Sequence, residues 1–283
     1  MNRQDMLSAD AYCLSLADQH YENFSVASKL LPPSVRLDLA RIYAYCRTTD
    51  DLGDESGSRE SARARLERWR DEVIAAFNGK PAIHPVLIAL SETVRDHHLP
   101  LEPFVDLIAA NVQDQEVCSY ETWSDVLAYC RNSAAPVGRM VLAVFGIHNA
   151  VTVPLSDDVC IGLQLANFAQ DVARDAAIGR TYLVQSDIRA GGMAEATRIM
   201  VDRARELLGS GRTLERMAPA GLRFQLALYR LGGLAICDAI ARIGYRTEFD
   251  RPTVTRSVKL GLLARAIALS LLPARNVEHA ETA

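Results

Sequence analysis

The sequence has little that points to metal–sulfur centres or to secretion. Its six cysteines lie singly along the chain and none forms a CxxC pair, so the sequence indicates neither a zinc site nor a redox motif. The first ten residues lack the apolar core of a signal peptide. Together these absences predict a cytoplasmic protein with reduced thiols. The cysteines are at positions 13, 46, 118, 130, 160 and 237.

Long apolar runs and an excess of basic charge are also missing. No apolar stretch approaches the ~20 residues that cross a bilayer, and the two longest, 137–147 and 260–272, are interrupted by Arg139 and Arg265. The formal net charge is −4 and the sequence has no block of like charges, so it does not indicate a basic surface that would bind nucleic acid. The sequence therefore predicts neither a membrane span nor a nucleic-acid partner.

Strand-like alternation is nearly absent, and almost every segment has a helical period. With 49% hydrophobic and 23% charged residues and no linker or repeat, the chain is predicted to form one all-α domain, a helical bundle over residues 1–283. Pro136 and Gly138 should kink one long helix, and Gly232-Gly233 should allow a close neighbour. Helices are predicted at about residues 8–28, 33–52, 58–77, 84–97, 102–117, 122–145, 154–177, 193–209, 219–243 and 257–272.

The feature around which the chain is organised is a polar stripe in an otherwise apolar helix. Gln164, Asn167, Asp171 and Asp175 recur at i, i+3, i+7 and i+11, so a helix would place their side chains on one face. Two carboxylates one turn apart repel each other, and they do so more strongly where burial lowers the dielectric. The stripe therefore predicts a positive group that the sequence itself does not supply.

A second acidic row lies in the segment CRTTDDLGDE, where Asp50 and Asp54 are one helical turn apart. Cations held between the two rows would relieve the repulsion in both. Hard oxygen ligands with spare positions for water and phosphate favour magnesium over softer metals. The alternative is that each row is a solvated helix end, paired with Arg47 or Arg174.

With both rows identified, the chain resembles the head-to-head terpene synthases, the squalene and phytoene synthase family. DDLGD at 50–54 and NFAQDVARD at 167–175 look like the two aspartate-rich motifs of that family. The resemblance implies an isoprenoid-synthase-type bundle with a central apolar cavity. It covers essentially the whole chain, through HYENFSVASKLLP (20–32), YAYCR (43–47), the stretch 129–138, GRTYL (179–183) and GYRTEFDRPTVTRSVKL (244–260).

The resemblance also implies a diphosphate leaving group held by a magnesium cluster. Asp51 is expected to point aside from this cluster. Arg47 and Arg180 are expected to bind phosphate oxygens through their guanidinium groups, although Arg47 also suits a salt bridge to an aspartate. The expected magnesium ligands are Asn167, Asp171 and Asp175, completed by Asp50 and Asp54.

When the diphosphate leaves, the remaining carbocation needs an apolar, water-poor pocket with aromatic faces. By resemblance, Phe24, Tyr43, Phe168 and Tyr245 are expected to line it, although each also suits an ordinary core position. His20 is expected near the diphosphate, although a lone histidine is more often structural. Tyr129 and Gln164 are the polar residues expected inside the cavity. The catalytic residues are predicted to be Tyr129, Arg47, Asp54 and Asp171.

Two stretches favour one branch of the family. NVQDQ at 111–115 and YCRNSAAPVGR at 129–139 resemble hydroxysqualene synthase, the bacterial enzyme of hopanoid precursor synthesis that acts on presqualene diphosphate. Gln170 stands where members of the family often carry an arginine before the first aspartate of the second motif. The loss of that charge suits an enzyme that binds one diphosphate instead of two.

The implied reaction needs magnesium but no NADPH. Its substrate would come from a presqualene diphosphate synthase, and its product would pass to a hydroxysqualene reductase. The water that captures the carbocation is expected to be held by Asn132 or Ser133, helped by Arg131 or Gln113. These residues are polar in a stretch that is apolar in sister enzymes.

Three other functions remain as alternatives. The first is the head-to-head condensation of two farnesyl or geranylgeranyl diphosphates. The second is a non-catalytic assembly factor of the same fold, which would be expected to have broken aspartate motifs. The third is a peripheral membrane protein that carries lipid, with the final helix and its basic residues Lys259, Arg265 and Arg275 resting on a bilayer.

Overall fold

The computed structural model describes residues 3–20 and 31–271, without the side chain of His20. Within these ranges the helices are joined by loops, and one isolated β-bridge pairs Ser119 with Thr181. The all-α prediction is therefore confirmed. The chain forms two compact units: unit 1 comprises Met1–Val117 and Pro136–His148, and unit 2 comprises Cys118–Ala135 and Asn149–Ala283.

Unit 1 is a cluster of helices around one long central helix. Its helices are α1 (Arg3–His20), α3 (Pro33–Asp54), α4 (Arg59–Phe77), α5 (Pro85–His97), α6 (Glu102–Gln113) and α8 (Ala135–Val144). The central helix is α3, which packs against α1, α4, α5 and α6. It begins at a proline, which needs no N–H partner there, and it buries Leu39, Ile42 and Tyr45 at three-residue intervals. The Tyr45 hydroxyl donates to the Phe104 carbonyl at 2.8 Å and thereby joins α3 to α6.

A buried arginine fixes α3 against two neighbours. The Arg41 guanidinium donates to Asp10 of α1 at 2.8 Å and to Glu92 of α5 at 3.3 Å. Asp38, one turn earlier in α3, lies 3.4 Å from the same group. Removing one partner of such a buried cluster leaves an uncompensated charge, so the cluster holds α3 firmly in place.

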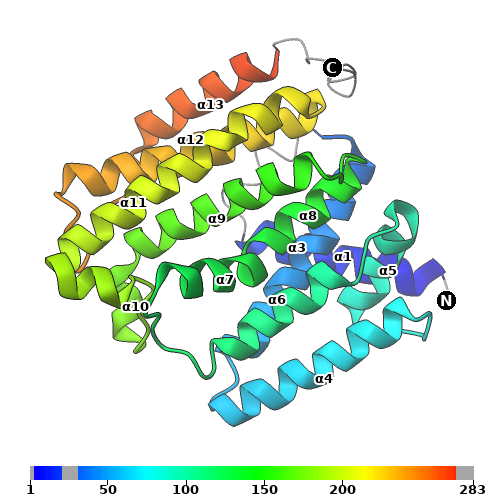
Figure 1. The fold of residues 1–283 in the computed structure, drawn as a ribbon. Coiled ribbons are helices and arrows are strands. Elements are labelled where there is room, and N and C mark those ends of the chain that lie inside the picture. Colours follow the sequence, from blue (N-terminus) through cyan, green and yellow to red (C-terminus); the bar gives the residue numbers. More distant parts are fainter. Residues whose placement is uncertain (1–2, 21–30, 272–283) are drawn as a thin grey trace. The chain divides into compact units, whose positions relative to one another are not determined.

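Unit 2 is a layer of long helices. Its helices are α7 (Trp123–Ser133), α9 (Thr152–Gln170), α10 (Val172–Ala177), α11 (Gln185–Met217), α12 (Ala220–Arg242) and α13 (Arg256–Ser270). Helices α9, α11 and α12 pack against one another, α7 packs on α9, and α13 lies along α12 (Figure 1). A buried ion pair joins α11 to α12, where Arg230 donates to Glu215 at 2.5 and 2.9 Å.

Glycines allow the helices of unit 2 to approach closely. A Cβ atom on Gly162 of α9 would lie 3.1 Å from the Ala204 carbonyl oxygen of α11. A Cβ atom on Gly233 of α12 would lie 2.8 Å from Leu163 and 2.9 Å from Leu208. The predicted close neighbour at Gly232-Gly233 is therefore confirmed at the second glycine, whereas Gly232 faces open space.

Two long predicted helices are each divided in two. The helix predicted at 122–145 becomes α7 and α8, separated at Ala134 (φ −118°, ψ −48°), because Pro136 has no N–H for the preceding turn. The helix predicted at 154–177 becomes α9 and α10, separated at Asp171 (φ −100°, ψ 17°). The predicted kink in the first is confirmed, but the break in the second was not expected.

Two other predicted boundaries differ from the structure. Helix α1 begins at Arg3 instead of residue 8, and the part of that prediction beyond residue 20 lies outside the described residues. Helix α11 begins at Gln185 instead of residue 193, with a bend at Gly192 (φ 81°, ψ 179°) that glycine adopts without strain. The bend interrupts the helical pattern of the sequence at Gly192, so the periodicity predicted only the part of α11 that follows it.

One helix in the described part of the chain, α12, is long and apolar enough to cross a membrane by length and composition. Most of its apolar stretch is buried within the structure, and it carries the buried Arg223 and Arg230. These features are typical of a core helix that is covered by neighbouring helices.

The close approach of α9 to α11 predicts opposite effects for two glycine replacements. Gly162→Ala should lower the free energy of unfolding by about 1–3 kcal/mol, because the new methyl group meets backbone atoms that cannot rotate away. Gly232→Ala is the matched control, since nothing lies within 4 Å of its Cβ position. It should raise the free energy of unfolding by about 0.5–1 kcal/mol through helix propensity. Urea denaturation measures both, and a Gly162→Ala protein as stable as wild type would contradict the helix packing described here.

Candidate active site

The acidic row of unit 1 lies in the last turns of α3. Asp50 and Asp54 are one turn apart, as predicted, and both side chains are exposed. The Asp50 carboxyl group is open to solvent on one side and crowded by protein on the others, and this burial raises its pKa to about 6. Repulsion from Asp54 adds to the rise, while a hydrogen bond from Asn111 opposes it. A cation at this carboxylate would relieve both unfavourable terms.

Asn111 of α6 orients the first carboxylate of this row. Its Nδ2 atom donates to Asp50 at 3.2 Å and to the Leu107 carbonyl at 3.1 Å. Gln115, one turn further on, donates to the Asn111 carbonyl at 3.1 Å. Gly53 lies against the Asn111 side chain, where a Cβ atom would be 3.0 Å from Oδ1. The sequence analysis singled out NVQDQ at 111–115 without assigning this positioning role.

Arg47 lies one turn before the acidic row and pairs with its outer member. The distance from its Nη2 atom to Asp51 is 2.5 Å, and that to Glu55 is 3.9 Å. The Nε atom of Arg47 is buried and has no hydrogen-bond partner among the described residues. The ion pair to Asp51 is the alternative that the sequence analysis left open for Arg47, and the Nε atom without a partner among the described residues leaves the predicted phosphate role to be tested.

Tyr43, one turn before Arg47 on α3, is partly buried. Burial raises the pKa of its hydroxyl, ahead of the opposing effect of Arg47. Arg47, Asp50 and Asp51 all act on its hydroxyl, so Tyr43 lies on the face of α3 that carries the acidic row. Two other residues predicted for the site, His20 and Phe24, lie outside the described side chains.

The polar stripe of unit 2 continues through the break between α9 and α10. The backbone N–H of Asp171 donates to Asn167 at 2.9 Å, and that of Asp175 donates to Asp171 at 2.8 Å. These i→i−4 bonds keep Asn167, Asp171 and Asp175 in helical register although the backbone angles at Asp171 are not helical. Gln164 is partly buried one turn earlier, and the Asn167 side chain is exposed.

An arginine that the sequence analysis did not identify, Arg251, pairs with this stripe. Its guanidinium forms an ion pair with Asp171, through Nε to Oδ1 and through Nη2 to Oδ2 at 3.3 Å. The Asp171 carboxylate is nearly buried, so this ion pair compensates a charge that water reaches poorly. The neighbouring Gln170 donates its side-chain amide to the Pro252 carbonyl at 2.7 Å. Together these contacts hold the loop that carries Arg251 against the second motif.

Arg180 follows the second motif in a tight turn. Its backbone N–H donates to the Asp175 carbonyl at 2.9 Å, and Gly179 before it has φ 77°, a conformation that glycine adopts without strain. The next N–H, of Thr181, donates to the Cys118 carbonyl at 2.8 Å. The turn therefore brings the backbone of Arg180 back to the last carboxylate-bearing residue of the stripe, and its predicted phosphate role stays a prediction.

A buried aromatic cluster lies beside the second motif. The rings of Phe168 and Tyr182 are stacked, with centroids 3.9 Å apart and an interplanar angle of 2°. The Tyr129 ring lies 5.6 Å from Tyr182, and Tyr120 lies 5.4 Å from Tyr129. Tyr129 and Phe168 were predicted near the site, but Tyr120 and Tyr182 were missed, because their segments have no helical period to reveal a buried face.

The end of α7 holds the residues expected to bind the capturing water. Ser133 has a buried hydroxyl without a hydrogen-bond partner among the described residues, and Asn132 beside it is partly buried. Tyr245 lies elsewhere in unit 2: it follows α12 with φ 61° and interacts with Arg205 of α11. Of these three residues, only Ser133 has an orphaned polar group in the described part of the chain.

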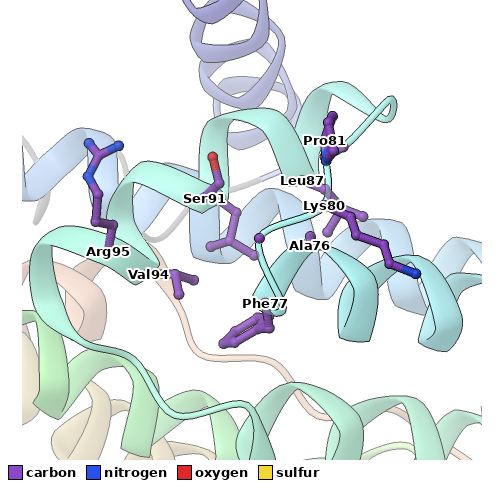
Figure 2. Close-up of a pocket in the computed structure, with 11 residues that line it drawn as sticks. Ala76, Phe77, Lys80, Pro81, Leu87, Ser91, Val94 and Arg95 are labelled. Carbon is purple, nitrogen blue, oxygen red and sulfur yellow. The ribbon is translucent and has the colours of Figure 1, made fainter. Parts of the chain in front are cut away.

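The structure also contains a pocket that involves none of the predicted site residues. It has a volume of about 360 Å³ and lies between the end of α4 and helix α5 in unit 1 (Figure 2). Phe77, Leu87 and Val94 line it, with Lys80 and Arg95 at its sides. The acidic row of α3 contributes nothing to this pocket, so it is not the predicted cavity.

Comparison with known proteins places these motifs in a family. Residues 17–258 match the family described as squalene/phytoene synthase. The chain belongs to the squalene/phytoene synthase family. It has 41% identity to the crystal structure of squalene synthase HpnC from Alicyclobacillus acidocaldarius, with a TM-score of 0.80 over 86% of this chain and 97% of that chain. The predicted isoprenoid-synthase fold is thereby confirmed.

Two curated relatives differ in the activity for which they are named. The 15-cis-phytoene synthase of a Paracoccus species is 32% identical over 285 residues, which cover 92% of each chain. The presqualene diphosphate synthase of Rhodopseudomonas palustris is 34% identical over 164 residues, which cover 57% of each chain. This chain is therefore a prenyl-diphosphate-processing member of the squalene/phytoene synthase family.

The donor atoms of both motifs have the chemistry that magnesium requires. Each motif presents carboxylate oxygens one helical turn apart, and the second adds the exposed amide of Asn167. In the described residues, no group of three or more His, Cys, Asp or Glu side chains is gathered into a preformed metal site. Magnesium bound by so few protein ligands keeps water and phosphate oxygens in its remaining positions, which suits a metal that arrives with a diphosphate.

Arg47 predicts a test of diphosphate binding in this squalene/phytoene synthase. Arg47→Lys should weaken the binding of magnesium pyrophosphate by about 10- to 100-fold, because an ammonium group cannot bridge two phosphate oxygens as a guanidinium does. Isothermal titration calorimetry measures this affinity directly. The matched control is Arg63→Lys, which alters an exposed arginine of α4 paired with Glu67 at 2.9 Å.

A second variant separates the phosphate role of Arg47 from its ion pair. Asp51→Asn removes the ion-pair partner but keeps the guanidinium, so affinity should change less than about threefold. If Arg47→Lys binds as wild type does while Asp51→Asn lowers stability, Arg47 serves only as a helix ion pair.

Proposed function

We propose that this protein converts presqualene diphosphate and water into hydroxysqualene and pyrophosphate. The carbon–oxygen bond to the diphosphate breaks, and the pyrophosphate keeps the bonding electron pair. The cyclopropylcarbinyl cation that remains opens its ring, and a water oxygen adds to the rearranged cation and loses one proton. Atoms and charges balance without an oxidant or reductant, so NADPH is not required.

Similarity to relatives supports this branch over its sisters. Identity to squalene synthase HpnC is 41%, against 32% and 34% for the phytoene synthase and presqualene diphosphate synthase relatives. The last two are named for making phytoene or presqualene diphosphate. In the proposed sequence of reactions, a presqualene diphosphate synthase supplies the substrate and a hydroxysqualene reductase consumes the product.

The two motifs supply the groups for diphosphate release. When bound, magnesium acts as a Lewis acid on the phosphate oxygens. Arg47, with its free buried Nε, and Arg180, at the turn after the second motif, bind the remaining phosphate oxygens through charge-assisted hydrogen bonds. The proposed magnesium ligands are Asp50, Asp54, Asn167, Asp171 and Asp175.

The observation that carries the water-capture step is the buried hydroxyl of Ser133, which has no hydrogen-bond partner in the described part of the chain. A buried polar group without a partner costs free energy, and such groups in native proteins usually bind water or a ligand. Ser133 stands at the end of α7, a helix that packs on α9 of the second motif. A water held there by Ser133, with Asn132 beside it, attacks the cation.

Gln170 further supports a single diphosphate. Its side-chain amide is already committed to the Pro252 carbonyl at 2.7 Å, and it carries no charge for a second anionic group. Enzymes that join two prenyl diphosphates must bind both anions, and an arginine at this place would serve that purpose. The Gln170 side chain is neutral and already hydrogen-bonded, which is consistent with the binding of a single diphosphate.

A second candidate function is the condensation of two farnesyl or geranylgeranyl diphosphates. The phytoene synthase and presqualene diphosphate synthase relatives favour it, since both are named for condensation products. Both candidates share the magnesium-assisted release of diphosphate. They differ in whether the carbocation meets water or a second prenyl chain.

The decisive experiment is a product analysis with purified protein and magnesium, without NADPH. Presqualene diphosphate alone should give hydroxysqualene by mass spectrometry, with an oxygen-18 label when the reaction runs in labelled water. Farnesyl diphosphate alone should give no product. Presqualene diphosphate made from farnesyl diphosphate, or phytoene made from geranylgeranyl diphosphate in a parallel sample, would instead establish the condensing function.

Ser133 predicts how the product mixture changes. In Ser133→Ala the ratio of alcohol to hydrocarbon products should fall about fivefold, since the lost hydrogen bond to the capturing water contributes about 1 kcal/mol. Pyrophosphate release should stay near the wild-type rate. Ser124→Ala, on the exposed side of the same helix, is the matched control. An unchanged product ratio in Ser133→Ala would show that the water is held by other groups.

A further inference from the structure

Helix α13 exposes a continuous apolar stripe. Leu260, Ala264, Ile267 and Leu271 recur at i, i+4, i+7 and i+11, the spacing of one helix face. The exposed fractions of the three large side chains are 68% for Leu260, 42% for Ile267 and 80% for Leu271. The stripe is about 16 Å long at 1.5 Å per residue. Large apolar side chains gathered on one exposed face usually mark an interaction surface.

The stripe is not the face that holds α13 in unit 2. Helix α13 packs along α12, and its fully buried residue is Ala266. On a helical projection Ala266 lies about 100° or more from each large residue of the stripe. Figure 1 shows α13 at the edge of unit 2, on α12. One side of α13 therefore packs on the core of unit 2, and another side exposes apolar residues to solvent.

The charge around the stripe has one sign. Helix α13 carries three basic residues, Arg256, Lys259 and Arg265, and no acidic residue, in a chain whose net charge is −4. Arg256 lies one turn before Leu260 on the same face, and Lys259 flanks it. The acid of the underlying α12, Asp238, is engaged by Arg205 of α11 at 2.9 Å. The surface therefore presents apolar side chains bordered by cations that no nearby acid of α12 or α13 neutralises.

From this combination we infer that α13 binds the surface of a bilayer that contains anionic lipids. Leu260, Ile267 and Leu271 enter the boundary between headgroups and acyl chains, while Arg256 and Lys259 contact lipid phosphates. A protein partner with an apolar groove would also cover the stripe, but it would need an acidic rim, whereas an anionic bilayer offers both properties everywhere. The inference concerns α13 alone and is independent of which prenyl diphosphate the protein uses.

Sedimentation with lipid vesicles tests this inference on the full-length protein. Wild type should pellet with vesicles that contain phosphatidylglycerol and remain in the supernatant with phosphatidylcholine alone. The double variant Leu260→Gln/Ile267→Gln should lower the partition coefficient at least about tenfold, because it removes two large apolar anchors. The matched control, Ile83→Gln/Val151→Gln, replaces two other exposed apolar residues, 91% and 56% exposed, and should bind as wild type does.

A charge variant gives a second, independent measurement. Arg256→Gln/Lys259→Gln should lower binding to the phosphatidylglycerol vesicles about tenfold, and added salt should weaken wild-type binding in the same way. Arg65→Gln/Arg70→Gln, on the exposed face of α4, is the control. Circular dichroism melts should be unchanged in all variants, since the replaced side chains are exposed.

Three results would overturn the inference. The first is wild-type protein that fails to pellet with anionic vesicles. The second is equal binding by the α13 variants and their controls. The third is a wild-type dimer in analytical ultracentrifugation that becomes a monomer in Leu260→Gln/Ile267→Gln, which would assign the stripe to self-association. Pyrophosphate release in detergent solution should be unchanged in these variants, so failure here leaves the proposed reaction unaffected.

Discussion

Carboxylates that stand close together on a helix need positive charge beside them, and both acidic motifs of this protein are arranged around that need. In unit 1, Arg47 draws Asp51 away from the row, which leaves Asp50 and Asp54 as the members open to solvent. In unit 2, Arg251 neutralises the nearly buried Asp171. Each motif is therefore partly compensated by an internal arginine. A hard cation bound by carboxylate oxygens of the motifs would complete this compensation.

Carboxylate oxygens can bind a cation in a fixed geometry only if the helices that carry them are held in place. The two units hold these helices by different interactions. In unit 1 a buried arginine with three carboxylate neighbours clamps the helix that ends in the first motif. In unit 2 the helix that leads into the second motif lies directly on the backbone of α11, because Gly162 has no side chain. A charged cluster thus fixes the motif helix in unit 1, and close packing at a glycine fixes it in unit 2.

Periodicity in the sequence was enough to predict the helices and the two motif faces, because both depend on residues close together in the chain. The ion pair between Arg47 and Asp51 is also local, since the two residues are one helical turn apart. Partners from distant segments could not be predicted this way. Arg251 lies 80 residues from Asp171, and Asn111 lies 61 residues from Asp50. Nothing in the local pattern shows which loop or helix returns to a given carboxylate. The break at Asp171 was not predicted from the local pattern either.

The bond from Gln170 to the Pro252 carbonyl has a consequence for the evolution and recombination of this family. It joins the end of α9 to the loop that carries Arg251, so the second motif and that loop act as one inherited unit although they are far apart in the chain. A chimera that exchanges residues 164–175 with a relative but keeps the native loop would place a foreign motif against that loop. Crossover points that keep both segments from the same parent preserve the bond from Gln170 and the ion pair between Asp171 and Arg251.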